Sequence, residues 1–147
     1  MNKLSTLMLL GAASILWMQR AAAFEWPLMA GDYWDVSGIY VKDGGGLKYA
    51  NFLAGDWRKQ QEFAKSKGWI KGYMVFENTS PRAGEPNLYL VSIVESFPAG
   101  AESEKREKEF EAWAKKSTEV MESEAGNRAE FREVKDSFVL RELKFRN

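Results

Sequence analysis

Two neighbouring segments of the chain, Ile70–Glu77 and Asn87–Phe97, carry apolar or aromatic side chains at both sets of alternating positions. Their β-branched and aromatic content predicts strands. The loop between them contains Pro81, Gly84 and Pro86, which predicts an antiparallel hairpin. Because successive side chains of a strand point to opposite faces, a strand that is apolar on both faces requires burial on both. Any sheet that contains this hairpin must therefore be covered on two sides.

The segments around the hairpin complete the predicted order β-α-β-β-α-β. Tyr33–Lys42 reads as a strand that ends at a glycine-rich turn, and the apolar spacing over Tyr49–Ser66 predicts a helix that stops at Gly68. A second helix is predicted from an N-cap at Ser103 to about residue 126, followed by a turn over 129–134 and a last strand over Phe138–Phe145. We predict an α+β, ferredoxin-like domain with a four-stranded antiparallel sheet and two helices on one face.

The predicted arrangement leaves the second face of the sheet without a cover from its own chain. Since the strands are apolar on both faces, a second copy of the sheet is the natural cover, and two-fold dimers are the commonest way to supply one. The sequence therefore predicts a homodimer.

The N-terminus has the pattern of a secretory signal peptide over residues 1–23. Lys3 precedes the uncharged apolar run Leu4–Met18, and Ala21, Ala22 and Ala23 provide small residues for cleavage after Ala23. An uncleaved membrane anchor is the alternative, but the apolar run is shorter than the roughly 20 residues that span a bilayer. We expect an exported mature protein, periplasmic or secreted, without a stable membrane anchor, in which 24–31 form an irregular extension and 32–147 the folded domain.

Composition excludes several kinds of chemistry. The sequence has no Cys and no His, so nucleophile systems that need His or Cys, zinc sites built on thiolate or imidazole, and haem held by His or Cys are ruled out. Removing Lys3 and Arg20 with the signal peptide leaves 19 basic against 21 acidic residues. Nucleic acid is an unsuitable partner for such a surface, and we expect no metal and no cofactor.

The element order, the helical segment YANFLAGDWRKQQEFAKSKGW and the strand-loop-strand YMVFENTSPRAGEPNLYLVSIVESF resemble the dimeric α+β barrel superfamily. That resemblance covers nearly all of Asp32–Phe145 and implies two ferredoxin-like subunits that press their sheets together. Its members include small monooxygenases, haem-handling proteins, isomerase-like enzymes and ligand sensors, so the resemblance implies a fold more than a function. The haem-degrading branch uses a His that this sequence lacks.

Aromatic and polar side chains of the predicted strands and first helix are the candidate ligand-binding residues. An aromatic pocket with a few polar groups suits a small hydrophobic or aromatic molecule, although the same residues are also expected in a dimer interface. The candidates are Tyr40, Trp57, Tyr73, Tyr89, Glu95 and Arg141.

Three functions remain open from the sequence. The leading one is an exported protein that binds a small hydrophobic or aromatic molecule in a pocket between sheet and helices or at the dimer interface. One alternative is a cofactor-independent monooxygenase-like enzyme in which Asp56, Trp57 and Tyr73 place the substrate. The other is a structural or interaction protein whose exposed loops, chiefly 78–86, contact a partner. No catalytic residue is assigned.

Overall fold

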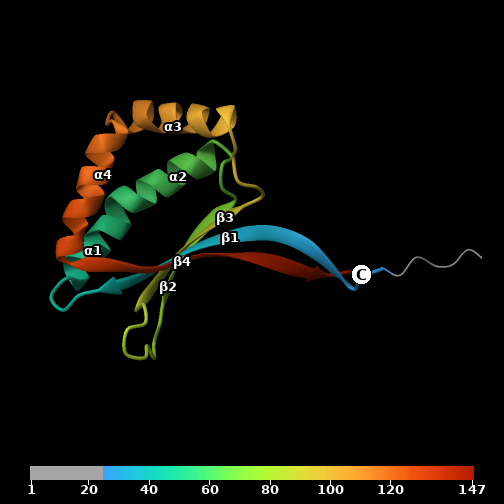
Figure 1. The fold of residues 1–147 in the computed structure, drawn as a ribbon, viewed down its shortest axis with the longest axis horizontal. Helices are drawn as coiled ribbons and strands as arrows, with labels where there is room; N and C mark the ends of the chain where they lie inside the picture. The colour runs from blue at the N-terminus through green and yellow to red at the C-terminus, as the bar shows by residue number, and fades with distance from the viewer. Residues whose placement is uncertain (1–24) are drawn as a thin grey trace, which may run out of the picture.

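A four-stranded antiparallel sheet organises residues 25–147, the part of the chain described by the computed structural model (Figure 1). The strands are β1 (Leu28–Val41), β2 (Gly72–Glu77), β3 (Leu88–Val94) and β4 (Arg132–Phe145), in the spatial order β2-β3-β1-β4. The predicted α+β class and antiparallel sheet are confirmed, and the arrangement is compatible with a ferredoxin-like fold. The predicted signal peptide, with its cleavage site after Ala23, lies outside the described residues.

The helices follow the first and third strands. α1 (Gly46–Phe52), a π-helical turn η1 (Leu53–Trp57) and α2 (Arg58–Ser66) run without interruption between β1 and β2. After β3 come α3 (Ala101–Ala114), α4 (Thr118–Asn127) and a short 3₁₀ turn η2 (Arg128–Glu130). Figure 1 shows α3 and α4 as two sides of an arch, with α2 inside it.

The prediction of a single second helix from Ser103 to about residue 126 is wrong. The helix begins at Ala101, with its N-cap at Gly100, and breaks at Lys115, which has a left-handed φ of 53°. The Glu111 side chain then accepts the Thr118 backbone N–H at 2.7 Å and so supports the start of α4. The sequence does not indicate a left-handed conformation at Lys115, because the residue that ends a helix in this conformation is usually glycine.

Two predicted strand boundaries are also wrong. β1 begins at Leu28 inside the predicted irregular extension, and β4 begins at Arg132 instead of Phe138. Leu28 pairs with Phe145, so the ends of β1 and β4 support each other although Pro27 and Gly31 interrupt the local pattern. In Figure 1 these ends project beyond β2 and β3 as a two-stranded arm.

The pairing register of the four strands determines which side chains lie on each face of the sheet. On one face the Ser92 hydroxyl donates to Gln61 Oε1 of α2 at 2.9 Å, so this face looks toward the helices. The opposite face, called here the open face, carries aromatic and aliphatic side chains around a shallow hollow of about 270 Å³. Its residues are Trp34, Val36, Phe76, Tyr89, Val91, Phe138 and Leu140.

The core of the single chain is small. In residues 25–147 only five apolar side chains are buried, namely Val36, Ile39, Tyr49, Val91 and Val94. By contrast, β4 is exposed on both faces: Phe138 and Leu140 of the open face are 40% and 52% accessible, and Val139 between them is 50% accessible. The feature that the sequence predicts, strands apolar on both faces, therefore remains without full burial in one subunit.

Two adjacent glycines before α1 provide a matched test of packing between the start of the first helix and the start of β4. A Cβ on Gly45 would lie 2.5 Å from the carbonyl oxygen of Phe131, whereas a Cβ on Gly46 would meet nothing within 4 Å. We expect Gly45→Ala to lower the free energy of unfolding by about 1 to 3 kcal/mol through overpacking. Gly46→Ala should leave it unchanged or raise it by up to about 1 kcal/mol. Urea unfolding measures both, and equal effects would contradict this packing.

Candidate functional site

The six predicted ligand-binding residues do not meet in one pocket. Trp57 and Tyr73 do come together, since their rings meet edge to face at 5.4 Å between η1 and β2. The Tyr73 hydroxyl donates to Glu62 Oε1, and this hydrogen bond raises the pKa of Tyr73. Tyr89 lies on the open face, 6.5 Å from the Phe138 ring.

The other three predicted residues lie apart from these. Lys135 Nζ lies 5.4 Å from the Tyr40 ring centre, so Tyr40 contacts β4. The Arg141 guanidinium lies 4.7 Å from the ring centre of Tyr33. Glu95 follows β3, with its side chain 82% accessible. The six predicted residues therefore lie on several separate surfaces, and of these six only Trp57 and Tyr73 form an aromatic pair.

A different group of side chains surrounds a cavity of about 250 Å³ where the first helical segment meets the corner between α3 and α4. We call it the junction cavity. Its lining residues are Phe52, Asp56, Lys59, Gln60, Trp113, Ala114, Lys116, Met121, Glu124 and Arg128.

The π-helical turn η1 lies at this cavity. A π turn inserts an extra residue per turn and is often found at functional sites. Here Asp56 lines the junction cavity, while the next residue, Trp57, packs against Tyr73 of the sheet. The turn thus presents an acidic group to the cavity and an aromatic anchor to the sheet from consecutive positions.

Arg128 is the most constrained charged group of the cavity lining. Its guanidinium lies 4.2 Å from the Phe52 ring centre, and Nη1 donates to the carbonyl oxygen of Glu124 at 3.1 Å. Its Nε is buried and has no hydrogen-bond partner. Burial, followed by the neighbouring charge of Arg132, lowers the pKa of Arg128.

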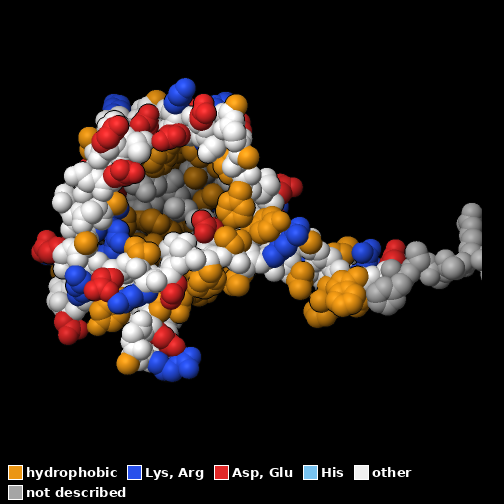
Figure 2. All heavy atoms as spheres, viewed as in Figure 1, with side chains coloured by type: hydrophobic (Ala, Val, Ile, Leu, Met, Phe, Trp, Pro, Cys, Tyr) orange, Lys and Arg blue, Asp and Glu red, His pale blue; other side chains and the backbone are white. Residues whose placement is uncertain are grey.

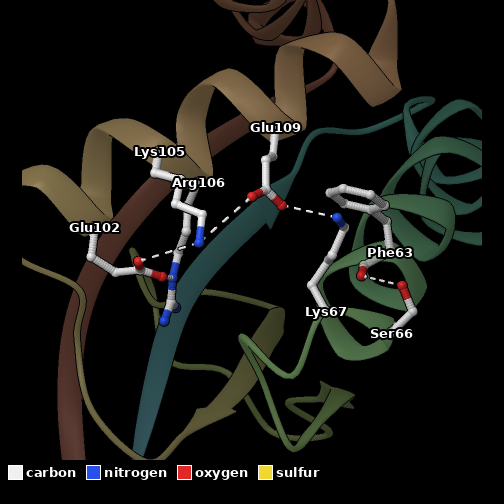
Figure 3. A network of polar contacts seen from close by, with 7 residues as sticks. All are labelled: Phe63, Ser66, Lys67, Glu102, Lys105, Arg106 and Glu109. Atoms are coloured by element: carbon white, nitrogen blue, oxygen red, sulfur yellow. Dashed lines mark hydrogen bonds and ion pairs between the residues drawn. The ribbon is translucent and has the colours of Figure 1, made fainter.

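A contact between α2 and α3 holds the arch over the first helical segment. The Phe63 ring stacks on Trp113 with centroids 4.6 Å apart and also lies 5.9 Å from the Phe110 ring. Figure 3 shows the polar edge of this contact, where Nζ of Lys67, the residue after α2, lies 2.9 Å from Glu109 Oε2 of α3. Because Trp113 both stacks on Phe63 and lines the junction cavity, the contact fixes one wall of the cavity.

Beneath the arch the surface is hollowed. Figure 2 shows hydrophobic side chains inside a hollow that the helices frame, with acidic side chains on the outer side of α3. The first turn of α3 contains the acidic residues Glu102 and Glu104. Apolar surface is therefore reachable from solvent at the centre of this side of the molecule.

A second concave region lies between the first helix and the sheet, where the predicted sheet-helix pocket would be. Val41, Tyr49, Leu53, Val75 and Leu88 are among its lining residues. Two of its polar lining residues already have partners within the chain: the Asn87 side chain bonds the N–H and carbonyl of Val41, and Lys42 Nζ donates to Ala129 O. The polar groups of the junction cavity are less fully satisfied.

Two other kinds of site are absent from the described residues. Among residues 25–147, no group of three or more Asp or Glu side chains is arranged to hold a metal ion. Within the same range, no helix has the length and apolar character needed to cross a bilayer.

No protein-family model, curated protein or solved structure matches this chain. Function therefore has to be argued from the residues themselves.

The sequence already contains part of the signal for the junction cavity. Phe52, Trp113 and Met121 belong to the apolar stripes that predict the two helices, and such stripes normally indicate packing. Arg128 gives no local signal, because its place depends on the break between α3 and α4. Sequence reasoning missed the cavity since it treated the second helical region as one helix.

Tyr49, the most buried large side chain, makes stability depend on pH at the alkaline end. Burial raises the pKa of Tyr49 above its ordinary value of 10.0, and Arg132 and Arg128 oppose this rise. Above pH 10 the unfolded chain loses the tyrosine proton before the folded chain does, so the free energy of unfolding should fall as pH rises through and beyond 10. Tyr49→Phe should reduce that loss in denaturant titrations between pH 9 and 11. An unchanged slope would contradict the buried, protonated state of Tyr49.

Proposed function

We propose that this chain is an exported homodimeric protein of the ferredoxin-like, dimeric α+β barrel type that binds a small hydrophobic or aromatic molecule. The junction cavity is the proposed binding site, and its combination of aromatic walls with a few charged side chains carries the proposal. Ligand sites in proteins are typically apolar concavities with a few polar groups that fix orientation.

The dimensions and walls of the cavity support this ligand class. About 250 Å³ is enough for one small aromatic molecule and is at the lower end of typical ligand pockets, roughly 300 to 1,000 Å³. Phe52, Trp113 and Met121 supply apolar and polarisable contact surface. The ligand would bridge the first helical segment and the arch, which also contact each other through the rings of Phe63, Phe110 and Trp113.

The small core supports the homodimer. The open face consists of apolar side chains such as those of a protein core, yet Phe138 and Leu140 on it are exposed to solvent. The open face of a second copy would bury them. A two-fold axis would place the same apolar residues of both subunits opposite each other, as in an isologous interface.

The predicted signal peptide over residues 1–23 supports export to the periplasm or the medium. Since nothing in a chain of this composition requires disulfides, an oxidising compartment imposes no extra condition on the fold.

The monooxygenase-like alternative finds less support. It requires Asp56, Trp57 and Tyr73 to hold one substrate, whereas Asp56 lines the junction cavity and Trp57 packs against Tyr73 at the sheet. The interaction-protein alternative has no feature of its own beyond the exposed loop over 78–86.

Native mass spectrometry of the protein purified from the exported fraction of its host tests the proposal as a whole. We expect a dimer of chains that begin at Phe24, with a retained mass of a few hundred daltons in part of the population. A monomer at micromolar concentration would overturn the dimer, and a chain that keeps residues 1–23 would overturn cleavage.

Adjacent residues of β4 test which face forms the dimer. Leu140 lies on the open face and Val139 on the other, with nearly equal exposure of 52% and 50%. We expect Leu140→Lys to give monomers, because it buries two uncompensated charges at the interface. Val139→Lys should leave the dimer intact. Light scattering after size-exclusion chromatography distinguishes the two, and the reverse pattern would assign the interface to the helix side.

Filling the junction cavity tests the binding site. Ala114 lines the cavity, whereas Ala112 is an exposed residue of the same helix that does not. We expect Ala114→Leu to weaken the binding of small aromatic compounds at least tenfold, because the added methylene groups occupy ligand space. Ala112→Leu should bind like the unmodified protein. Quenching of tryptophan fluorescence reports binding through Trp113, and equal affinities of both variants would place the ligand elsewhere.

A further inference from the structure

The charges around the junction cavity indicate which small aromatic molecules fit it. We infer that the ligand is a small aromatic carboxylate whose ring contacts Phe52 and Trp113 and whose carboxylate binds at Lys59 and Arg128. This inference rests on the proposed function and specifies the chemical class of its ligand.

Arg128 provides the first reason. Its Nε is buried without a hydrogen-bond partner, although Nη1 is satisfied by the backbone of α4. A buried donor left unpaired costs about 1 to 3 kcal/mol, more for a charged group. A carboxylate suits the positive charge of a guanidinium and is a strong acceptor for its N–H groups.

The balance of charges provides the second reason. Lys116 and Glu124 neutralise each other across 2.6 Å, so they add no net charge to the lining. Of the remaining charged residues, Lys59 and Arg128 are basic and Asp56 is acidic. Within residues 25–147, Lys59 takes part in no ion pair. The cavity therefore has one positive charge in excess.

Arg132, which is not a lining residue, adds a further positive charge near Arg128. Its charge acts on Arg128 and on Tyr49, and its own Nε is also buried without a partner. Two neighbouring guanidinium groups repel each other; Glu124 and Asp56 already offset part of this repulsion at Arg128, and a further anion close to Arg128 would relieve more of it.

The aromatic walls decide between an aromatic acid and a simple inorganic anion. Phosphate or sulfate would satisfy the cations but would leave Phe52, Trp113 and Met121 in contact with water. A benzene ring fits the apolar part of the cavity and places only its substituents near the charged groups. Asp56 can then accept a hydrogen bond from a hydroxyl group of the ring, so 4-hydroxybenzoate is a suitable probe.

The test compares 4-hydroxybenzoate with its methyl ester at neutral pH, using isothermal titration calorimetry on the mature full-length protein. The two compounds share the ring and the hydroxyl group, but only the acid carries a charge. We expect the acid to bind at least tenfold more tightly. Lys59→Gln and Arg128→Gln should each reduce this preference at least threefold, whereas Lys65→Gln, which removes an exposed lysine of α2 outside the cavity, should not.

The outcomes separate the two proposals. Equal binding of acid and ester, or tighter binding of the ester, overturns the carboxylate inference and leaves an aromatic binding protein. If neither compound binds, the carboxylate inference is overturned. If uncharged aromatic compounds of similar size also fail to bind, the proposed function is overturned too. If Lys59→Gln still binds 4-hydroxybenzoate more tightly than the methyl ester by the same factor, the inference is also contradicted. Lys59→Gln alone is sufficient for the test if Arg128→Gln does not fold.

Discussion

One helical segment holds the described part of this molecule together, because it contacts the sheet on one side and the α3–α4 arch on the other. The segment from Gly46 to Ser66 meets the sheet through Trp57 and Gln61 and meets the arch through Phe63. The α3–α4 arch has its clearest side-chain contacts with this segment and the residue that follows it, as the Phe63–Trp113 stack and the Lys67–Glu109 pair show. A helix with two apolar sides is thus an inner layer between the sheet and the outer helices.

The same construction explains why the cavity lies at the corner of the arch. Lys115 turns the chain between α3 and α4 through a left-handed residue, so the two helices diverge around the segment that they contact. Phe63 fills the contact along α3, but near the corner the neighbouring side chains are the shorter Ala114 and the charged Lys59 and Lys116. Close packing requires complementary apolar side chains, and at this corner the chain supplies charged ones.

Local sequence patterns were sufficient to predict much of the fold but not to predict the candidate site. The hairpin of β2 and β3 was predictable because its alternation and its Pro and Gly loop are encoded in adjacent residues, and the stop after α2 follows from Gly68, which has a positive φ of 69°. The early start of β1 was not predictable, since it depends on pairing with a strand more than 100 residues away. The junction cavity depends on the relative placement of three helices, which no local pattern contains. Tyr89 and Tyr73 illustrate the same limit: the register, in which Tyr73 pairs with Ser92 and Phe76 with Tyr89, puts the two tyrosines on opposite faces, and alternation within each strand shows neither this register nor which face the helices cover.

The exposed edge strand β4 has a consequence for the aggregation of the single chain. An edge strand of 14 residues with free backbone groups is a template for pairing with other chains. Charged residues interrupt this strand so often that its longest uncharged stretch is only Ser137–Leu140. Segments that form intermolecular β-structure usually need five to seven uncharged, apolar residues in succession. A single chain is therefore protected from indefinite edge-to-edge growth, while the side chains of Phe138 and Leu140 stay exposed and available for the proposed contact between two copies.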